Sequence, residues 1–181
     1  MKKMISMLLA LVMVLSLAAC GANNEPATEA PTEAAKHVEG TMEELLNKVI
    51  EIQPVEFMGG TVPIDITDTS EEGLWLLSGN TGLENADSIT DAATFGPMMG
   101  SIAYCMSAVR VKEGADVAAV AQTMKTNIDP RKWVCVEADD LQVVSYGDVV
   151  MLIMVASDNG MTSQSFVDAF AQVCGGEVTT H

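Results

Sequence analysis

Histidine, aromatic residues and basic residues are scarce in this chain of 181 residues. It has two histidines, 4% aromatic residues, and nine Lys and Arg against 25 Asp and Glu, which gives a formal net charge of −16. Such an acidic surface repels the phosphates of nucleic acids, because their binding depends on Lys and Arg. The composition therefore excludes nucleic acid as a partner.

The scarcity of histidine and of aromatic residues also bears on catalysis. A Ser-His-Asp or Cys-His arrangement needs a histidine within the fold, whereas His37 lies in a polar segment near the N-terminus and His181 is the last residue. Carboxylate pairs that hydrolyse glycosides need a substrate cleft with stacking aromatic rings. We therefore predict that the protein is not an enzyme and has no catalytic residues.

Motifs for metals and cofactors are missing as well. Cys105, Cys135 and Cys174 have spacings that match no zinc or redox motif, and the acidic clusters do not fit the calcium loop, which needs its acids at fixed positions. We expect buried thiols, solvated loop carboxylates and no metal or cofactor. A disulfide between Cys105 and Cys135 is the alternative, if their predicted strands are neighbours in an exported protein.

The strongest signal lies at the N-terminus. Lys2 and Lys3 form a short basic start, and residues 4–19 are apolar except for two serines and end in small side chains. This run is shorter than the ~20 residues that a membrane-spanning helix needs. We predict a signal peptide over residues 1–19.

The stretch Leu17-Ala18-Ala19-Cys20-Gly21 resembles a bacterial lipobox. The resemblance implies that the sulfur of Cys20 receives a diacylglyceryl group before the signal peptide is cleaved. Two acyl chains give stable anchoring, whereas one chain binds only marginally. We therefore expect a lipid-anchored protein on the extracytoplasmic face of the cell membrane, with membrane lipid as its partner through Cys20.

The segment that follows the lipobox has little to bury. Residues 20–40 combine low hydrophobicity, acidic charge and two prolines, which is typical of a disordered and fairly extended spacer. The remaining residues, 41–181, are of a length typical of a single domain.

Residues 41–181 are predicted to fold as one α+β domain. Capping residues and helical spacing of apolar side chains predict helices over 42–52, 71–78, 115–128 and 163–173. Runs rich in β-branched and apolar residues predict strands over 62–66, 88–95, 102–111, 133–136, 141–145 and 149–156, the last buried on both faces. This order predicts a small antiparallel or mixed sheet of about four strands with helices packed against it.

Arg110 is the candidate ligand-binding residue, because it interrupts a strand of small and apolar side chains. It either faces solvent or turns toward a pocket, where its guanidinium would pair with the carboxylate of a ligand. Met98 and Met99 are the methionine pair that we expect to be exposed together, whereas the methionines of the predicted helices and strands fill the core.

Three stretches carry a wider resemblance: Met98-Met99 with Ile102-Ala103, Val109-Arg110-Val111-Lys112-Glu113-Gly114, and Ser145-Tyr146-Gly147-Asp148-Val149-Val150. Together they resemble an uncharacterised lipoprotein domain family of Gram-positive anaerobic bacteria, over roughly residues 42–174. The lipobox and the acidic spacer are similar to those that its members carry. The resemblance implies the location and the fold, and it provides no catalytic residues.

We therefore expect a membrane-anchored lipoprotein whose domain is a non-enzymatic binding or scaffold module of the cell envelope, with an envelope protein as partner. The alternative is a small-ligand or metal-binding lipoprotein that is accessory to a transporter. A concave pocket lined by convergent polar groups would favour the alternative, whereas a flat exposed apolar patch would favour a protein partner.

The lipobox yields the first testable prediction. Cys20→Ala is expected to abolish the acylation, because no sulfur remains to accept the diacylglyceryl group. Intact-mass spectrometry of the native protein should find a chain that begins at Cys20 and carries acyl groups. An unmodified Cys20, or a chain that still begins at Met1, would contradict the prediction.

Overall fold

A six-stranded antiparallel sheet forms the middle layer of the domain. The structure, a computed structural model, describes residues 36–181; the predicted signal peptide, Cys20 and the predicted spacer up to residue 35 lie outside the described residues. The strand order is β1-β2-β3-β5-β4-β6. The strands are β1 (Gly59–Pro63), β2 (Ile89–Pro97), β3 (Tyr104–Val111), β4 (Asp140–Tyr146), β5 (Val149–Val155) and β6 (Thr179–Thr180).

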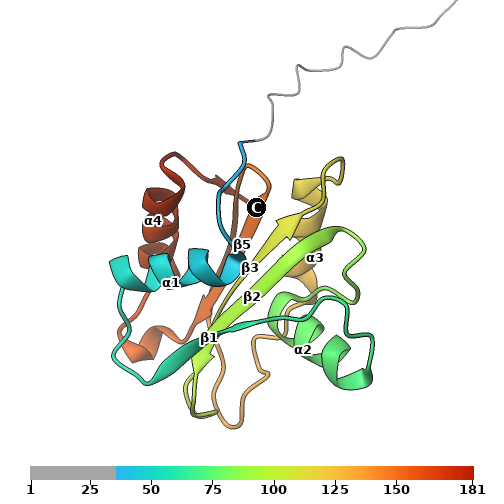
Figure 1. The fold of residues 1–181 in the computed structure, drawn as a ribbon. Helices are drawn as coiled ribbons and strands as arrows, with labels where there is room; N and C mark the ends of the chain where they lie inside the picture. Colours follow the sequence, from blue (N-terminus) through green and yellow to red (C-terminus); the bar gives the residue numbers. More distant parts are fainter. Residues whose placement is uncertain (1–35) are drawn as a thin grey trace, which may run out of the picture. The chain divides into compact units, whose positions relative to one another are not determined.

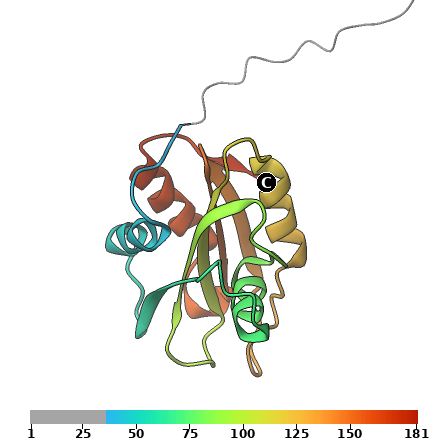
Figure 2. The ribbon, with the colours of Figure 1, turned by 45° about the vertical axis from the view of Figure 1, so that its right-hand side comes forward.

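Helices cover both faces of this sheet (Figures 1 and 2). On one face lie α1 (Met42–Ile52) and α4 (Ser163–Cys174), and on the other lie α2 (Glu71–Thr81) and α3 (Val117–Asn127). A short 3-10 helix, η1 (Ser157–Asn159), follows β5. The predicted α+β class is confirmed. Within residues 36–181, no helix combines the length and the apolar composition needed to cross a bilayer.

Strand β5 is buried on both faces, as the continuous apolar run predicts, because it is central in the sheet and helices cover both sides. Successive side chains of a strand point to opposite faces, so β5 contributes to two cores. The core beneath α1 and α4 receives Val149, Met151, Ile153 and Val155. The core beneath α2 and α3 receives Val150, Leu152 and Met154.

Residues adjacent in sequence determine where α1 begins and where α2 ends. The predicted capping box of α1 is present: the Thr41 hydroxyl accepts from the Glu44 N–H at 3.2 Å, and the Glu44 carboxylate accepts from the Thr41 N–H at 3.0 Å. Helix α2 continues to Thr81, so its predicted end at residue 78 is wrong. It ends at Gly82, whose φ of 76° lies in the left-handed region that favours glycine.

The sheet differs from the prediction in three details. It has six strands rather than about four, because the short strands β1 and β6 add an edge on each side. Strand β1 covers 59–63 rather than 62–66. Residues 133–136, predicted to be a strand, belong to the loop before β4, and Cys135 has a φ of 64°, which strand backbone does not adopt.

The two-sided burial of β5 predicts a strong effect of truncating its centre. Leu152→Ala is expected to lower the free energy of unfolding by about 2–5 kcal/mol, because it leaves a cavity at a fully buried position. Val62→Ala, at a half-exposed position of the edge strand β1, is the control and should cost less than about 1 kcal/mol. Urea unfolding followed by circular dichroism measures both. Equal losses would contradict this account of the core.

Candidate functional site

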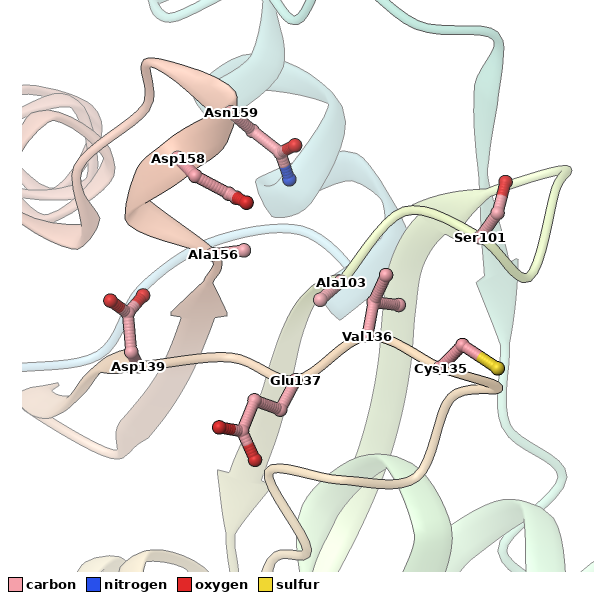
Figure 3. A pocket seen from close by; sticks show the side chains of 9 residues that line it. All are labelled: Ser101, Ala103, Cys135, Val136, Glu137, Asp139, Ala156, Asp158 and Asn159. Carbon is pink, nitrogen blue, oxygen red and sulfur yellow. The ribbon is translucent and has the colours of Figure 1, made fainter.

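A cavity of about 350 Å³ opens at one end of the sheet (Figure 3). Three segments form its walls: the loop 98–103 before β3, the loop 128–139 between α3 and β4, and the end of β5 with η1. Its lining residues are Ser101, Ala103, Cys135, Val136, Glu137, Asp139, Ala156, Asp158 and Asn159. We call this region the cavity end of the domain.

Three carboxylates give the cavity a negative charge: Glu137, Asp139 and Asp158. The hydroxyl and the backbone N–H of Ser157 donate to Asp139 at 2.6 and 2.7 Å, and these bonds hold the pKa of Asp139 below its usual range. Asp139 is therefore ionised at neutral pH. In Figure 3, the side chains of Asp158 and Asn159 extend from η1 over the cavity.

Arg131 is the basic partner of one of these carboxylates. Its Nε donates to Glu137 at 2.8 Å, but both side chains are exposed, and exposed ion pairs contribute little. An incoming cation can compete for Glu137 at low cost. The cavity is therefore suited to a positively charged group.

Two of the loops that form the cavity walls also carry exposed apolar side chains. Met98 and Met99 precede Ser101 in the same loop and are 74% and 63% exposed, and Val134, next to Cys135, is 77% exposed. The prediction that Met98 and Met99 are exposed together is confirmed. Met58 lies beside them, because its carbonyl accepts from the Met98 N–H at 2.9 Å. Contiguous exposed apolar side chains mark surfaces that bind another molecule, and Met58, Met98 and Met99 are such neighbours.

Arg110 lies far from the cavity, at the other end of β3. Its guanidinium donates to Asp148 at 2.6 Å and to the backbone carbonyls of Val38 and Gly40, each at 2.7 Å. The Arg110 and Asp148 side chains are only 13% and 19% exposed. Arg110 thus holds residues 36–40, which the prediction assigned to the spacer, against the domain. A ligand-binding role for Arg110 stays a prediction.

Asp148 completes this attachment, and we call Arg110 and Asp148 the clamp. The Asp148 carboxylate also accepts from the Val38 N–H at 3.2 Å and lies 2.8 Å from Nδ1 of His37. Burial raises the pKa of Asp148, but the hydrogen bonds from Arg110, Val38 and His37 outweigh it and hold this pKa below the ordinary value. The clamp therefore carries a full ion pair at neutral pH.

Gly147 permits the chain to approach so closely. It turns β4 into β5 with a φ of 58°, and a Cβ atom there would lie 1.5 Å from the Lys36 carbonyl oxygen. That carbonyl accepts from the Asp148 N–H at 3.3 Å. Only glycine allows both the turn and this contact.

The clamp and the cavity end lie at opposite ends of the same strands. Arg110 pairs with Val149 at one end of β3, and Tyr104 pairs with Val155 at the other. At a rise of about 3.3 Å per residue, the two ends are about 20 Å apart. In Figure 1, residues 36–40 lie at the upper end, and the loops 98–103 and 128–139 lie at the lower end.

The cysteines and histidines of residues 36–181 differ in burial and in their partners. Cys105 is buried as predicted, but the prediction of buried thiols is wrong for Cys135, which is exposed, and for Cys174, which is partly buried. Cys105 and Cys135 are both free thiols, so the alternative of a disulfide between them is not present. His181 lies with Nε2 2.7 Å from the Ser145 hydroxyl, and burial, with the charge of Lys125, lowers the pKa of this histidine. Within residues 36–181 no carboxylate bonds to His181, so the pair lacks the third member of a catalytic triad.

The cavity is a site that the sequence did not reveal, because its walls come from segments far apart in the chain. The one local signal is the acidic cluster of Glu137, Asp139 and Asp140, which the sequence predicts to be solvated loop charge. No group of three or more His, Cys, Asp or Glu side chains in the described part of the chain is arranged to hold a metal ion.

Comparison with protein-family models, with curated proteins and with solved structures finds no match for this chain. The cavity end is therefore identified by its geometry: a concave acidic surface at the end of the sheet remote from the clamp, with exposed methionines in one of its loops.

The clamp predicts a local effect of removing its charge. Asp148→Asn is expected to accelerate hydrogen exchange at the Val38 amide and to lower the free energy of unfolding by about 1–3 kcal/mol, because Arg110 loses a charged acceptor. Arg131→Gln, which removes an exposed ion pair, is the control and should change stability by less than about 1 kcal/mol.

The same pair predicts how stability depends on pH. Because the Asp148 pKa is lower in the folded protein, its contribution is complete above the ordinary value of 3.8 and is lost as pH falls through the folded-state pKa. The difference in unfolding free energy between wild type and Asp148→Asn should shrink in acid. A difference that is constant from neutral to acidic pH would contradict the clamp.

Proposed function

We propose that this protein is a lipid-anchored lipoprotein of the extracytoplasmic membrane face, and that its domain is a non-enzymatic binding or scaffold module of the cell envelope. The export signal over residues 1–19 and the lipobox at Cys20 support the location. The resemblance to lipoprotein domains of Gram-positive bacteria agrees with it. The binding role rests on the cavity end.

The opposite placement of the clamp and the cavity end is the observation that carries this proposal. The chain that leads to Cys20 leaves the domain at the clamp, about 20 Å along the strands from the cavity. An anchor at Cys20 would be attached through the clamp end and would leave the cavity end free of the attachment. A binding surface belongs at such an end.

The chemistry of the cavity end defines the partner. Met98, Met99 and Val134 offer apolar contact, and methionine side chains adapt their shape to a partner surface. Glu137 and Asp158 attract Lys or Arg, and such complementary charges accelerate association and fix its register. The partner is thus an envelope protein with an apolar surface and a basic side chain that enters the cavity.

A small cationic ligand is the alternative, and the concavity of the site favours it. A volume of about 350 Å³ lies in the range of small-molecule sites. Such a ligand would need the carboxylates but not the methionines. The domain would then serve as a ligand-binding accessory of a transporter.

Crosslinking in intact cells tests the proposal. The double variant Met98→Ser with Met99→Ser is expected to reduce the capture of an envelope protein by about tenfold or more, because two exposed apolar contacts are lost. Val62→Ser changes an exposed apolar residue of β1 outside the cavity and should leave capture unchanged. Cys20→Ala separates loss of anchoring from loss of the surface.

A second pair of measurements separates the two candidate functions. The small-ligand alternative predicts that spermidine raises the melting temperature of the wild type but not that of the double variant Glu137→Gln with Asp158→Asn. It also predicts that the double methionine variant keeps the response to spermidine. If no protein is captured and spermidine has no effect, the cavity end is not the binding site.

A further inference from the structure

A polar cluster is buried between the sheet and α2, and no residue of it lines the cavity. Its centre is the thiol of Cys105 on β3, which lies 3.5 Å from the Ser107 hydroxyl and 3.8 Å from the Thr94 hydroxyl. Thr94 and Ser107 are paired across β2 and β3. The thiol therefore has a defined place in a core that is otherwise apolar.

Lys132 is held directly over this sulfur. Its Nζ lies 3.2 Å from Cys105 Sγ and also donates to the Gly79 carbonyl at 2.7 Å and the Asn80 side-chain oxygen at 2.8 Å. Gly79 and Asn80 belong to the last turn of α2, where helix carbonyls attract a cation. Three acceptors thus hold the Lys132 amine at the Cys105 thiol, although Lys132 and Cys105 are 27 positions apart in the sequence.

We propose that Cys105 and Lys132 are a modification site, at which a peroxide induces a covalent sulfur–nitrogen crosslink. Proximity is the basis: reacting groups that the fold already holds in contact do not need to find each other. The product is a sulfenamide between Cys105 Sγ and Lys132 Nζ.

The reaction has two balanced steps. Hydrogen peroxide transfers one oxygen atom to the thiol, which becomes a sulfenic acid, and the remaining atoms leave as water; sulfur loses two electrons and peroxide gains them. The Lys132 ammonium then loses a proton to solvent, and its lone pair attacks sulfur. The S–N bond forms, the S–O bond breaks, and the hydroxyl leaves as water with a second proton from nitrogen.

The other cysteines of residues 36–181 do not share this arrangement. Cys135 is exposed and Cys174 is partly buried, and neither is within hydrogen-bonding distance of a lysine amine in this part of the chain. Burial also raises the pKa of Cys174 to about 12, which keeps it a thiol at neutral pH. The crosslink is therefore specific to Cys105.

The crosslink would act on the cavity wall. Lys132 belongs to the loop 128–139, which contributes Cys135, Val136 and Glu137 to the cavity. A bond from Lys132 to β3 ties this loop to the sheet. Oxidation would thus restrain one wall of the cavity, whichever partner the cavity binds.

Mass spectrometry of the oxidised protein tests this proposal. The full chain with Cys135→Ser, which removes the exposed competing thiol, is extracted in detergent, treated with hydrogen peroxide while folded, and digested without reductant. The expected product is a peptide pair that joins Cys105 to Lys132 with the loss of two hydrogen atoms. Dithiothreitol should separate the pair, because a thiol cleaves the sulfur–nitrogen bond.

Two controls isolate the contribution of the fold. Lys132→Arg keeps the positive charge without the amine nucleophile and should give no crosslink. The same Cys135→Ser protein, oxidised in urea, should give at least about tenfold less, because the amine is no longer held at the sulfur. The proposal is overturned if Cys105 in the folded chain stays a free thiol or becomes a sulfinic acid while Lys132 stays unlinked.

Discussion

Two-sided burial of β5 is the constraint on which the rest of the structure depends. Seven apolar residues in succession cannot face water, so helices must cover the sheet on both sides. The neighbouring strands β3 and β4 also contribute side chains to both cores, and this packing fixes the positions of their ends. The clamp lies where β5 begins, and the cavity lies where it ends. Both features therefore take their position from one strand.

The two ends use charge in opposite ways. At the clamp, Arg110 and Asp148 are largely buried, and backbone groups of residues 38–40 complete their hydrogen bonds. Such an ion pair is stable because few of its polar atoms lack a partner. At the cavity, Glu137 pairs with Arg131 where both side chains are exposed, and Asp158 lines the opening. The paired charges of the clamp and the carboxylates of the cavity thus lie at opposite ends of the strands.

The loop 128–139 links these features to the interior. It contributes carboxylates to the cavity, and the amine of its Lys132 contacts the buried thiol of Cys105. Its backbone follows no regular pattern, and the hydrogen bond from the Ala138 N–H to the Pro130 carbonyl closes it. Side-chain contacts and a few isolated backbone hydrogen bonds, rather than a ladder of backbone bonds, therefore hold one wall of the cavity.

Sequence by itself determined the features whose physical cause lies among near neighbours. The capping box at Thr41 and the buried run of β5 could be predicted because a few adjacent residues specify them. Only the tertiary structure decided that residues 133–136 are a loop. Their composition is typical of a strand, but they do not pair with any strand of the sheet in the described residues. The tertiary structure also decided the partners of Arg110 and the walls of the cavity. These contacts join segments that are distant in sequence, and the residues near each segment do not specify which other segment it will contact.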